Sequence, residues 1–145
     1  MDELNIALKK VLADTFLMYF KTHAFHWNVE GADFKQYHDF FGGIYEELFA
    51  AVDPIAEHVR ALDSYAPTTL KQLTSMAMVN EVDDPMTNPA EMLRTLIVDN
   101  NLVIVSLMRT YQLAEQASEL GLANFLQDRI DAHNKLGWML KAASK

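Results

Sequence analysis

Histidines and carboxylates are the side chains of this sequence that could bind a metal ion. The chain has 5 histidines and 20 aspartates and glutamates but no cysteine, so disulfides, thiolate zinc sites and cysteine nucleophiles are excluded. Imidazole and carboxylate ligands suit iron, manganese or zinc, and oxygen-rich mixed sites with open positions suit the oxidation of iron(II). The question is which of these residues can be brought together.

Di-iron proteins of the helical-bundle type build their centre within one subunit, from Glu-x-x-His pairs on facing helices. That motif is missing here, because no histidine has a glutamate three positions earlier. The residues found at those positions are Phe20, His23, Lys35, Ile55 and Ile130. We therefore expect no centre of that kind inside a single subunit.

The alternative ligand set consists of His26, His38, Asp53 and Glu57. If His38 and Asp53 lie on one helix, their fifteen-residue separation spans roughly 22 Å, so one chain cannot bring both to one ion. Two copies of this helix packed antiparallel across a two-fold axis can, because His38 of one copy then lies near Asp53 and Glu57 of the other. The spacing predicts a catalytic, metal-binding site shared between two subunits, with two equivalent sites per dimer.

Each of these residues also has a plain structural explanation. A single histidine on an apolar helix face is usually a hydrogen-bonded core residue. Asp53 directly precedes Pro54, and Asp followed by Pro is a good helix cap with its first helical residue. The joint spacing of the four residues favours the metal site, and the structural readings stay open beside it.

The shared site requires a long second helix, and the apolar pattern predicts one from about Phe34 to Leu62. Apolar residues recur there on two stripes rather than one. The first stripe holds Tyr37, Phe41, Ile44, Leu48, Val52, Ile55, Val59 and Leu62, and the second holds Phe40, Tyr45, Phe49 and Ala56. A helix that is apolar over so much of its circumference is expected to be buried on two sides, by its own subunit and by a partner.

The rest of the chain also predicts helices and no strand. We expect a first helix from about Asp2 to Trp27, a short helix near Thr68 to Leu73, a third long helix from Pro89 to about Leu120, and a fourth after Gly121, which divides the last two. Four long helices with one long crossover are typical of the ferritin-like bundle. The predicted fold class is an all-α, ferritin-like four-helix bundle. We expect residues 1–145 to form a single domain, with the short extra helix in the crossover between helices 2 and 3.

The sequence around the ligand set resembles the Dps family, the mini-ferritins. The shared pattern is His26-Trp27-Asn28-Val29-x-Gly31-x-x-Phe34, then His38, then Tyr45-x-Glu47-Leu48, then Asp53-x-x-Ala56-Glu57. It continues through Ala61-Leu62 and Pro67-x-Thr69-Leu70 to Trp138-Met139-Leu140-Lys141-Ala142. The resemblance covers most of the chain, and the spacing of the four ligand positions makes it specific.

The resemblance implies an assembly and an activity. Members of the family form hollow shells of twelve subunits, oxidise iron(II) at dimer interfaces, preferably with hydrogen peroxide rather than oxygen, and keep the ferric mineral inside. It implies that this chain is a ferroxidase and iron-storage subunit that protects against oxidative stress. His26 and His38 would come from one subunit and Asp53 and Glu57 from its partner, and Trp27 would stand beside the site, where an aromatic residue can quench radicals.

Three positions depart from the family pattern. Gly42 stands where many members have an acidic residue one helical turn after the second histidine, so we expect the centre to hold one metal firmly rather than two. Pro54 removes a helix hydrogen bond beside Asp53 and favours a kink or a break. His58 replaces the usual arginine, which removes an ion pair or adds a pH-sensitive group.

The formal net charge of -8 argues against nucleic-acid binding, and the lysine-rich tail by which some family members bind DNA is missing. The sequence starts without the basic and apolar regions of a secretory signal and has no apolar run long enough for a bilayer, so we expect a cytoplasmic protein with no membrane partner. Two alternatives stay open. One is an assembled shell with an impaired centre that acts as a structural or metal-buffering cage, and the other is a DNA-binding nucleoid protein.

Overall fold

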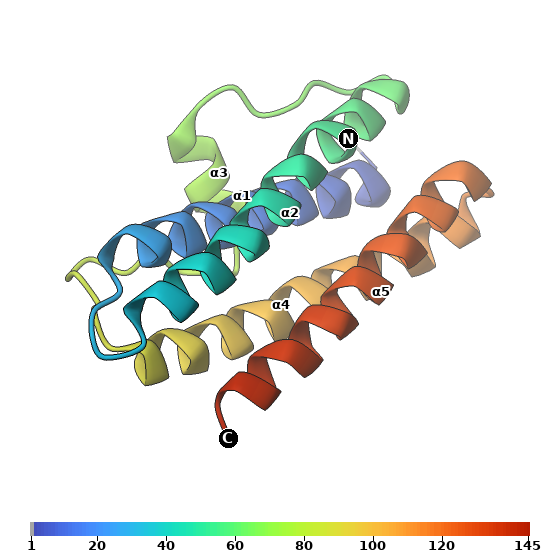
Figure 1. The fold of residues 1–145 in the computed structure, drawn as a ribbon. Helices are drawn as coiled ribbons and strands as arrows, with labels where there is room; N and C mark the ends of the chain where they lie inside the picture. Colours follow the sequence, from blue (N-terminus) through green and yellow to red (C-terminus); the bar gives the residue numbers. More distant parts are fainter. Residues whose placement is uncertain (1) are drawn as a thin grey trace.

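The computed structural model describes residues 2–145 and is built from helices alone over that range. In chain order they are α1 (Glu3–Asn28), α2 (Phe34–Ala61), α3 (Leu70–Met76), α4 (Pro89–Gln116) and α5 (Leu120–Ala143). Four of them are long, and α3 is the short helix in the crossover between α2 and α4 (Figure 1). The predicted all-α fold class is therefore confirmed, and the predicted bounds of the first two helices are correct to within one residue.

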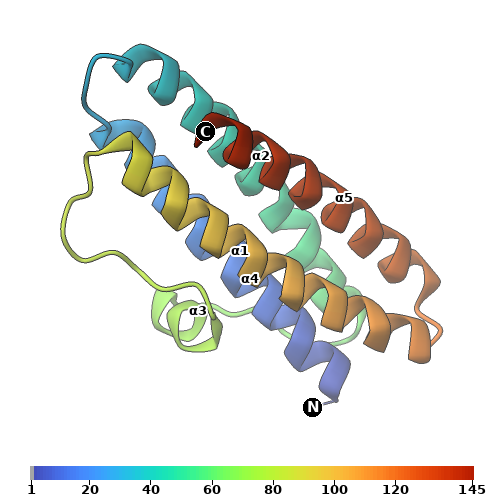
Figure 2. The same cartoon turned by 90° about the horizontal axis from the view of Figure 1, so that it is seen from below.

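The long helices form two antiparallel pairs, α1 with α2 and α4 with α5, and α1 also packs against α4 (Figures 1 and 2). The crossover runs back along the bundle, so α4 starts at the end where α1 finishes. A backbone hydrogen bond from Glu30 N to Thr87 O, 3.0 Å long, joins the crossover to the α1–α2 loop at that end. The α1–α2 loop and the start of α4 are thereby held together.

Local side-chain caps start three of these helices. Asp2 accepts a hydrogen bond from the backbone N–H of Asn5 at the start of α1, and Asn88 accepts one from Glu91 N before Pro89 in α4. Thr69 and Gln72 form a reciprocal capping box at α3. These caps satisfy backbone donors that the first helical turn cannot, so the sequence itself specifies where these helices begin.

The boundary between the last two long helices differs from the prediction. Helix α4 ends at Gln116 rather than near Leu120, because Ser118 adopts a left-handed conformation with φ of 59°. The N–H groups of Ser118 and Glu119 donate to the carbonyls of Glu115 and Ala114, which is the Schellman pattern of helix ends. Gly121 therefore lies inside α5, and the prediction that it divides the two helices is wrong.

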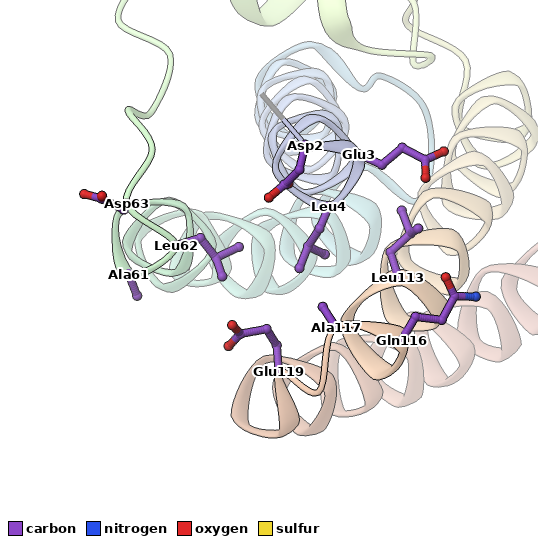
Figure 3. Close-up of a pocket in the computed structure, with 10 residues that line it drawn as sticks. All are labelled: Asp2, Glu3, Leu4, Ala61, Leu62, Asp63, Leu113, Gln116, Ala117 and Glu119. Carbon is purple, nitrogen blue, oxygen red and sulfur yellow. The ribbon is translucent and has the colours of Figure 1, made fainter.

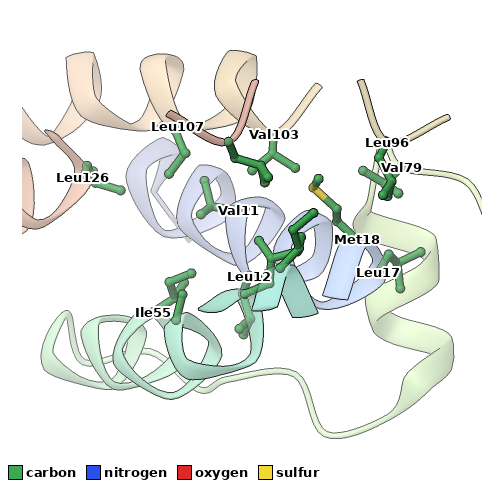
Figure 4. Close-up of a cluster of buried hydrophobic side chains, with 14 of the residues drawn as sticks. Val11, Leu12, Leu17, Met18, Ile55, Val79, Leu96, Val103, Leu107 and Leu126 are labelled. Atoms are coloured by element: carbon green, nitrogen blue, oxygen red, sulfur yellow. The ribbon is translucent and has the colours of Figure 1, made fainter. Parts of the chain in front are cut away.

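One apolar cluster fills the space between the helices (Figure 4). All four long helices contribute buried side chains to it, among them Val11 and Met18 of α1, Ile55 of α2, Leu107 of α4 and Leu126 of α5. Burial of apolar area contributes about 25 cal/mol per Å² and dominates the stability of such a bundle. No helix within residues 2–145 has the apolar length that a bilayer crossing requires.

A buried carboxylate ties the crossover to this core. Asp14 of α1 is fully buried, and its Oδ1 accepts hydrogen bonds from the backbone N–H groups of Met78 (2.6 Å) and Val79 (3.1 Å). Its Oδ2 accepts a hydrogen bond of 2.6 Å from the hydroxyl of Ser106 on α4. One side chain of α1 thus holds both the segment after α3 and helix α4.

Candidate metal centre

Two of the four predicted ligands meet where α1 ends and α2 begins. His26 lies in the last turn of α1 and His38 in the second turn of α2. The short connection of residues 29–33 turns the chain through Gly31, whose φ of 129° is rarely adopted by residues with a side chain. The two imidazole rings therefore lie face to face, with centroids 3.7 Å apart and planes 18° apart.

Reciprocal hydrogen bonds fix the orientation of both rings. His26 Nδ1 lies 2.6 Å from the carbonyl oxygen of His38, and His38 Nδ1 lies 2.6 Å from the carbonyl oxygen of His26. A carbonyl only accepts, so each Nδ1 carries a proton, and Nε2 is the nitrogen of each ring that does not face a carbonyl. Both Nε2 atoms are therefore available as metal ligands, since the usual partner of a ligating histidine is a carbonyl or carboxylate on its other nitrogen.

Gly42 lies directly beneath the ring of His26. A Cβ atom at position 42 would lie 3.3 Å from both Cε1 and Nδ1 of that ring, closer than ordinary van der Waals contact. Without a side chain, the α2 backbone approaches the imidazole closely enough for the hydrogen bond to His38 O to form. Gly42 replaces the acidic residue of the family pattern, and its lack of a side chain therefore also makes room for the ring of His26.

The two acidic ligands lie elsewhere on the subunit. Asp53 and Glu57 are exposed, one turn apart on α2, and α2 is a continuous helix from His38 through both of them. The separation of roughly 22 Å therefore holds, and no three His, Asp or Glu side chains of residues 2–145 come together to hold a metal ion. Because Pro54 and Asp53 lie within the helix, the predicted break and the helix-cap reading of Asp53 are both wrong.

A cluster of rings surrounds His23, which the sequence pattern did not single out as a site. Its imidazole is stacked on Tyr45 at 3.8 Å and 7°, with Trp27 on the ring at 4.2 Å. The Tyr19 hydroxyl lies 3.1 Å from His23 Nδ1. Burial, with the nearby His26 as a smaller cause, lowers the pKa of His23. The one-turn spacing of Tyr19, His23 and Trp27 was the available signal, but Tyr45 comes from another helix.

A polar network connects the ligand-bearing helix α2 to α5. Arg129 forms a two-pronged ion pair with Glu47 and also donates to His133 Nε2 at 3.3 Å. His133 is buried, and its Nδ1 donates to Asn100 Oδ1 at 2.8 Å. Burial first, and the positive charge of Arg129 second, lower the pKa of His133 to about 4. His58 packs on Phe125, with ring centroids 4.7 Å apart.

A hollow at the opposite end of the bundle is lined with carboxylates (Figure 3). It lies between the start of α1, the end of α2 and the α4–α5 turn. Three of its four carboxylates have other partners or directions: Asp2 caps α1, Glu3 pairs with Arg109 at 2.7 Å, and Asp63 points away, so Glu119 is the one that extends toward the hollow. Within residues 2–145 it provides no metal-ligand cluster, so the histidine pair is the better candidate site.

Comparison with known proteins places the chain among ferritin-like proteins. Residues 6–144 match the ferritin-like domain family. General stress protein 20U of Bacillus subtilis is 30% identical over 144 residues, which cover 97% of each protein. DNA protection during starvation protein 2 of Bacillus anthracis is 27% identical over 135 residues, covering 93% of this chain and 92% of that protein. The crystal structure of a Dps protein from Vibrio cholerae O1, described as a member of the ferritin-like diiron-carboxylate superfamily, superimposes with a TM-score of 0.94 at 26% identity, over 99% of this chain and 89% of that one.

Proposed function

The chain belongs to the ferritin-like family and, within it, to the Dps mini-ferritins, and from this premise we propose that it is a ferroxidase. In this proposal it oxidises iron(II), with hydrogen peroxide or oxygen as the oxidant, at sites shared between two subunits. The ferric product is stored as mineral inside a homo-oligomeric shell of twelve subunits. Removal of free iron(II) and peroxide together would protect the cell from oxidative stress.

The observation that carries the proposal is the half-site at the α1–α2 turn. His26 and His38 present two stacked imidazoles whose Nδ1 atoms are occupied by backbone carbonyls. Two nitrogen ligands without an acidic partner make an incomplete site, because iron(II) and iron(III) also need oxygen ligands. The ligands that complete the site must come from outside the subunit, and Asp53 and Glu57 are exposed on the same helix.

An antiparallel pair of α2 helices completes two such sites at once. In this arrangement the two-fold axis crosses α2 between Tyr45 and Leu48. His38 of each subunit then faces Asp53 and Glu57 of the other subunit. Phe49 lies close to that crossing point and is 55% exposed in the single subunit. A partner helix would bury this ring, which supports the prediction that the second apolar stripe of α2 faces another subunit.

The protein side chains bind and orient the substrate iron. The two imidazoles are held in orientation by the backbone carbonyls at their Nδ1 atoms, so each Nε2 can bind iron(II) without a change in that hydrogen bond. The two carboxylates offset the positive charge that increases when iron(II) becomes iron(III). Gly42 provides no carboxylate, so the site holds one iron firmly. The net charge of -8 is consistent with attraction of cations and not with DNA, and we place the shell in the cytoplasm.

Iron oxidation by the purified protein tests this proposal. Iron(II) is added without oxygen to protein of measured mass, peroxide follows, and ferric absorbance is recorded. We expect oxidation much faster than in buffer, loss of this acceleration in His38→Ala, and retention of it in His58→Ala, which removes an imidazole of α2 that packs on Phe125 instead.

Two results would contradict the proposal. Oxidation no faster than in buffer by an intact shell would indicate a structural or metal-buffering cage. A monomer in solution would leave the histidine pair without its acidic ligands and would exclude the shared site.

A further inference from the structure

A two-pronged ion pair joins the middle of α2 to α5. Both terminal nitrogens of Arg129 donate to the carboxylate of Glu47, and the longer of the two contacts, from Nη2 to Oε2, is 3.2 Å. The Arg129 side chain is mostly buried, whereas the Glu47 side chain is half-exposed. The backbones of α2 and α5 stay further apart than those of the pairs α1–α2 and α4–α5. Long side chains therefore bridge the space between these two helices.

The guanidinium group of Arg129 is itself held in place from α4. Its Nη2 lies 3.3 Å from His133 Nε2, one turn further along α5. Asn100 of α4 fixes His133 in turn, because its Oδ1 accepts from His133 Nδ1 at 2.8 Å and its Nδ2 donates to the His133 carbonyl at 2.9 Å. Asn100 and His133 are both fully buried. These contacts restrict the rotamers of Arg129, so its guanidinium group provides a fixed point against which α2 is placed.

Glu47 and the predicted partner face lie on opposite sides of α2. Successive residues of an α-helix are about 100° apart, so Glu47 and Phe49 point in directions about 200° apart. Phe49 is exposed in the single subunit and belongs to the stripe that the proposed partner helix covers. Glu47 also lies between Tyr45 and Leu48, where the proposed two-fold axis crosses α2. A contact at Glu47 therefore controls how far the middle of α2 projects toward the partner.

We propose that Arg129 is a positioning residue of the shared iron site and that it acts through Glu47. The inference rests on the proposed function, because it requires the dimer in which His38 of one subunit faces Asp53 and Glu57 of the other. Two-fold symmetry makes any displacement of α2 away from the partner occur in both subunits, so the distance across each site changes by twice that displacement. A movement of about 0.5 Å in each α2 opens a site by about 1 Å, and an error of that size can cost about a hundredfold.

A purely structural role for this ion pair predicts a different result. Ion pairs that reach solvent usually contribute little to folding stability. The four long helices are also held together by the apolar cluster, so loss of the ion pair should leave the subunit folded. A residue that positions the site should therefore change iron binding more than it changes stability.

Titration of the assembled protein with iron(II) in the absence of oxygen tests this role. Arg129→Met removes the guanidinium group, keeps a long side chain, and leaves the carboxylate of Glu47 without this partner. A carboxylate freed from a positive charge attracts cations more strongly, so electrostatics alone predicts tighter iron(II) binding in this variant. Loss of positioning predicts weaker binding, by about tenfold or more. The two explanations therefore predict changes of opposite sign.

Glu47→Gln and Glu47→Ala form a second test in which both variants have lost the same charge. Glu47→Gln keeps an oxygen that can accept from Arg129, whereas Glu47→Ala keeps none. We expect iron(II) binding close to that of the natural protein in the first variant and about tenfold weaker binding in the second. Arg109→Met is the matched control, because it breaks an exposed ion pair with Glu3 that joins α4 to α1, and its iron(II) binding should not change.

Native mass spectrometry and urea unfolding of each variant accompany the titrations. Weaker binding in Arg129→Met and Glu47→Ala, with the assembly intact and the control unchanged, supports the proposal. Unchanged or tighter binding in Arg129→Met, equal binding in the two Glu47 variants, or an equal loss in Arg109→Met would overturn it. If Arg129→Met does not assemble, the two Glu47 variants decide. If the natural protein binds no iron(II), the proposed function itself fails, whereas iron(II) binding that does not depend on Arg129 overturns this inference alone.

Discussion

Mixing two inactive variants gives the sharpest test of the shared site. His38→Ala removes an imidazole from one half of the site, and Asp53→Ala removes a carboxylate from the other half. In one subunit these residues are roughly 22 Å apart on an unbroken helix, and substitutions this far apart usually act independently. In a dimer with two-fold symmetry they belong to the same site, so either substitution alone disables both sites.

The expected recovery follows from counting sites. In a dimer of one His38→Ala subunit and one Asp53→Ala subunit, one site carries both defects and the other has its full ligand set. With equal amounts of the two variants, half of the dimers are mixed, so about a quarter of all sites are intact. We expect co-expressed variants to recover about a quarter of the normal ferroxidase rate, whereas each variant alone stays near the rate in buffer.

The assay is ferric absorbance after peroxide addition, with the composition of the mixed shells measured by mass spectrometry. Asp53→Ala mixed with Glu57→Ala is the matched control. Both acids come from the same subunit, so no site in that mixture is complete and no recovery is expected. Absence of recovery in the first mixture, or equal recovery in both, would refute the assignment of His38 and the two acids to opposite subunits.

Three further predictions concern the residues that support the site. Asp14→Ala leaves the Ser106 hydroxyl and two backbone N–H groups without their acceptor, and urea unfolding should show a loss of roughly 3 kcal/mol or more; a smaller loss would mean that Asp14 does not anchor the crossover. Folding lowers the pKa of His133 from its ordinary 6.5 to about 4, so the unfolded chain binds more protons in this range and stability should fall by about 3 kcal/mol as the pH drops through it. His133→Gln should flatten this dependence, and an unchanged slope would assign it to other groups. Gly42→Asp should add a second iron(II) per site in anaerobic titrations, and an unchanged stoichiometry would show that the contact with His26 excludes it.

Much of the fold could be predicted from the sequence because the signals are local. The periodicity of apolar residues identified four long helices, and Asn88 with Pro89 marked the start of α4 to the residue. The end of α4 could not be predicted in the same way. Gly121 is the stronger turn signal, but the chain turns at Ser118, where Schellman hydrogen bonds stabilise the left-handed residue.

The sequence by itself determined which types of side chain are available as metal ligands and that, on one helix, His38 and Asp53 cannot bind the same ion within one subunit. The absence of cysteine and of Glu-x-x-His excluded other centres, and the helical rise fixed the distance from His38 to Asp53. These conclusions depend only on residue identity and on spacing along one helix, which do not change with packing.

Only the tertiary structure decided which nitrogen of each imidazole is free and which rings surround His23. Each Nδ1 of the His26–His38 pair bonds to a carbonyl twelve positions away, and Tyr45 reaches His23 from another helix. Contacts between separate helices depend on how far apart the helices pack and how they are rotated about their axes. Those quantities are set by the whole core, including the backbone of Gly42 against the ring of His26, and not by local spacing.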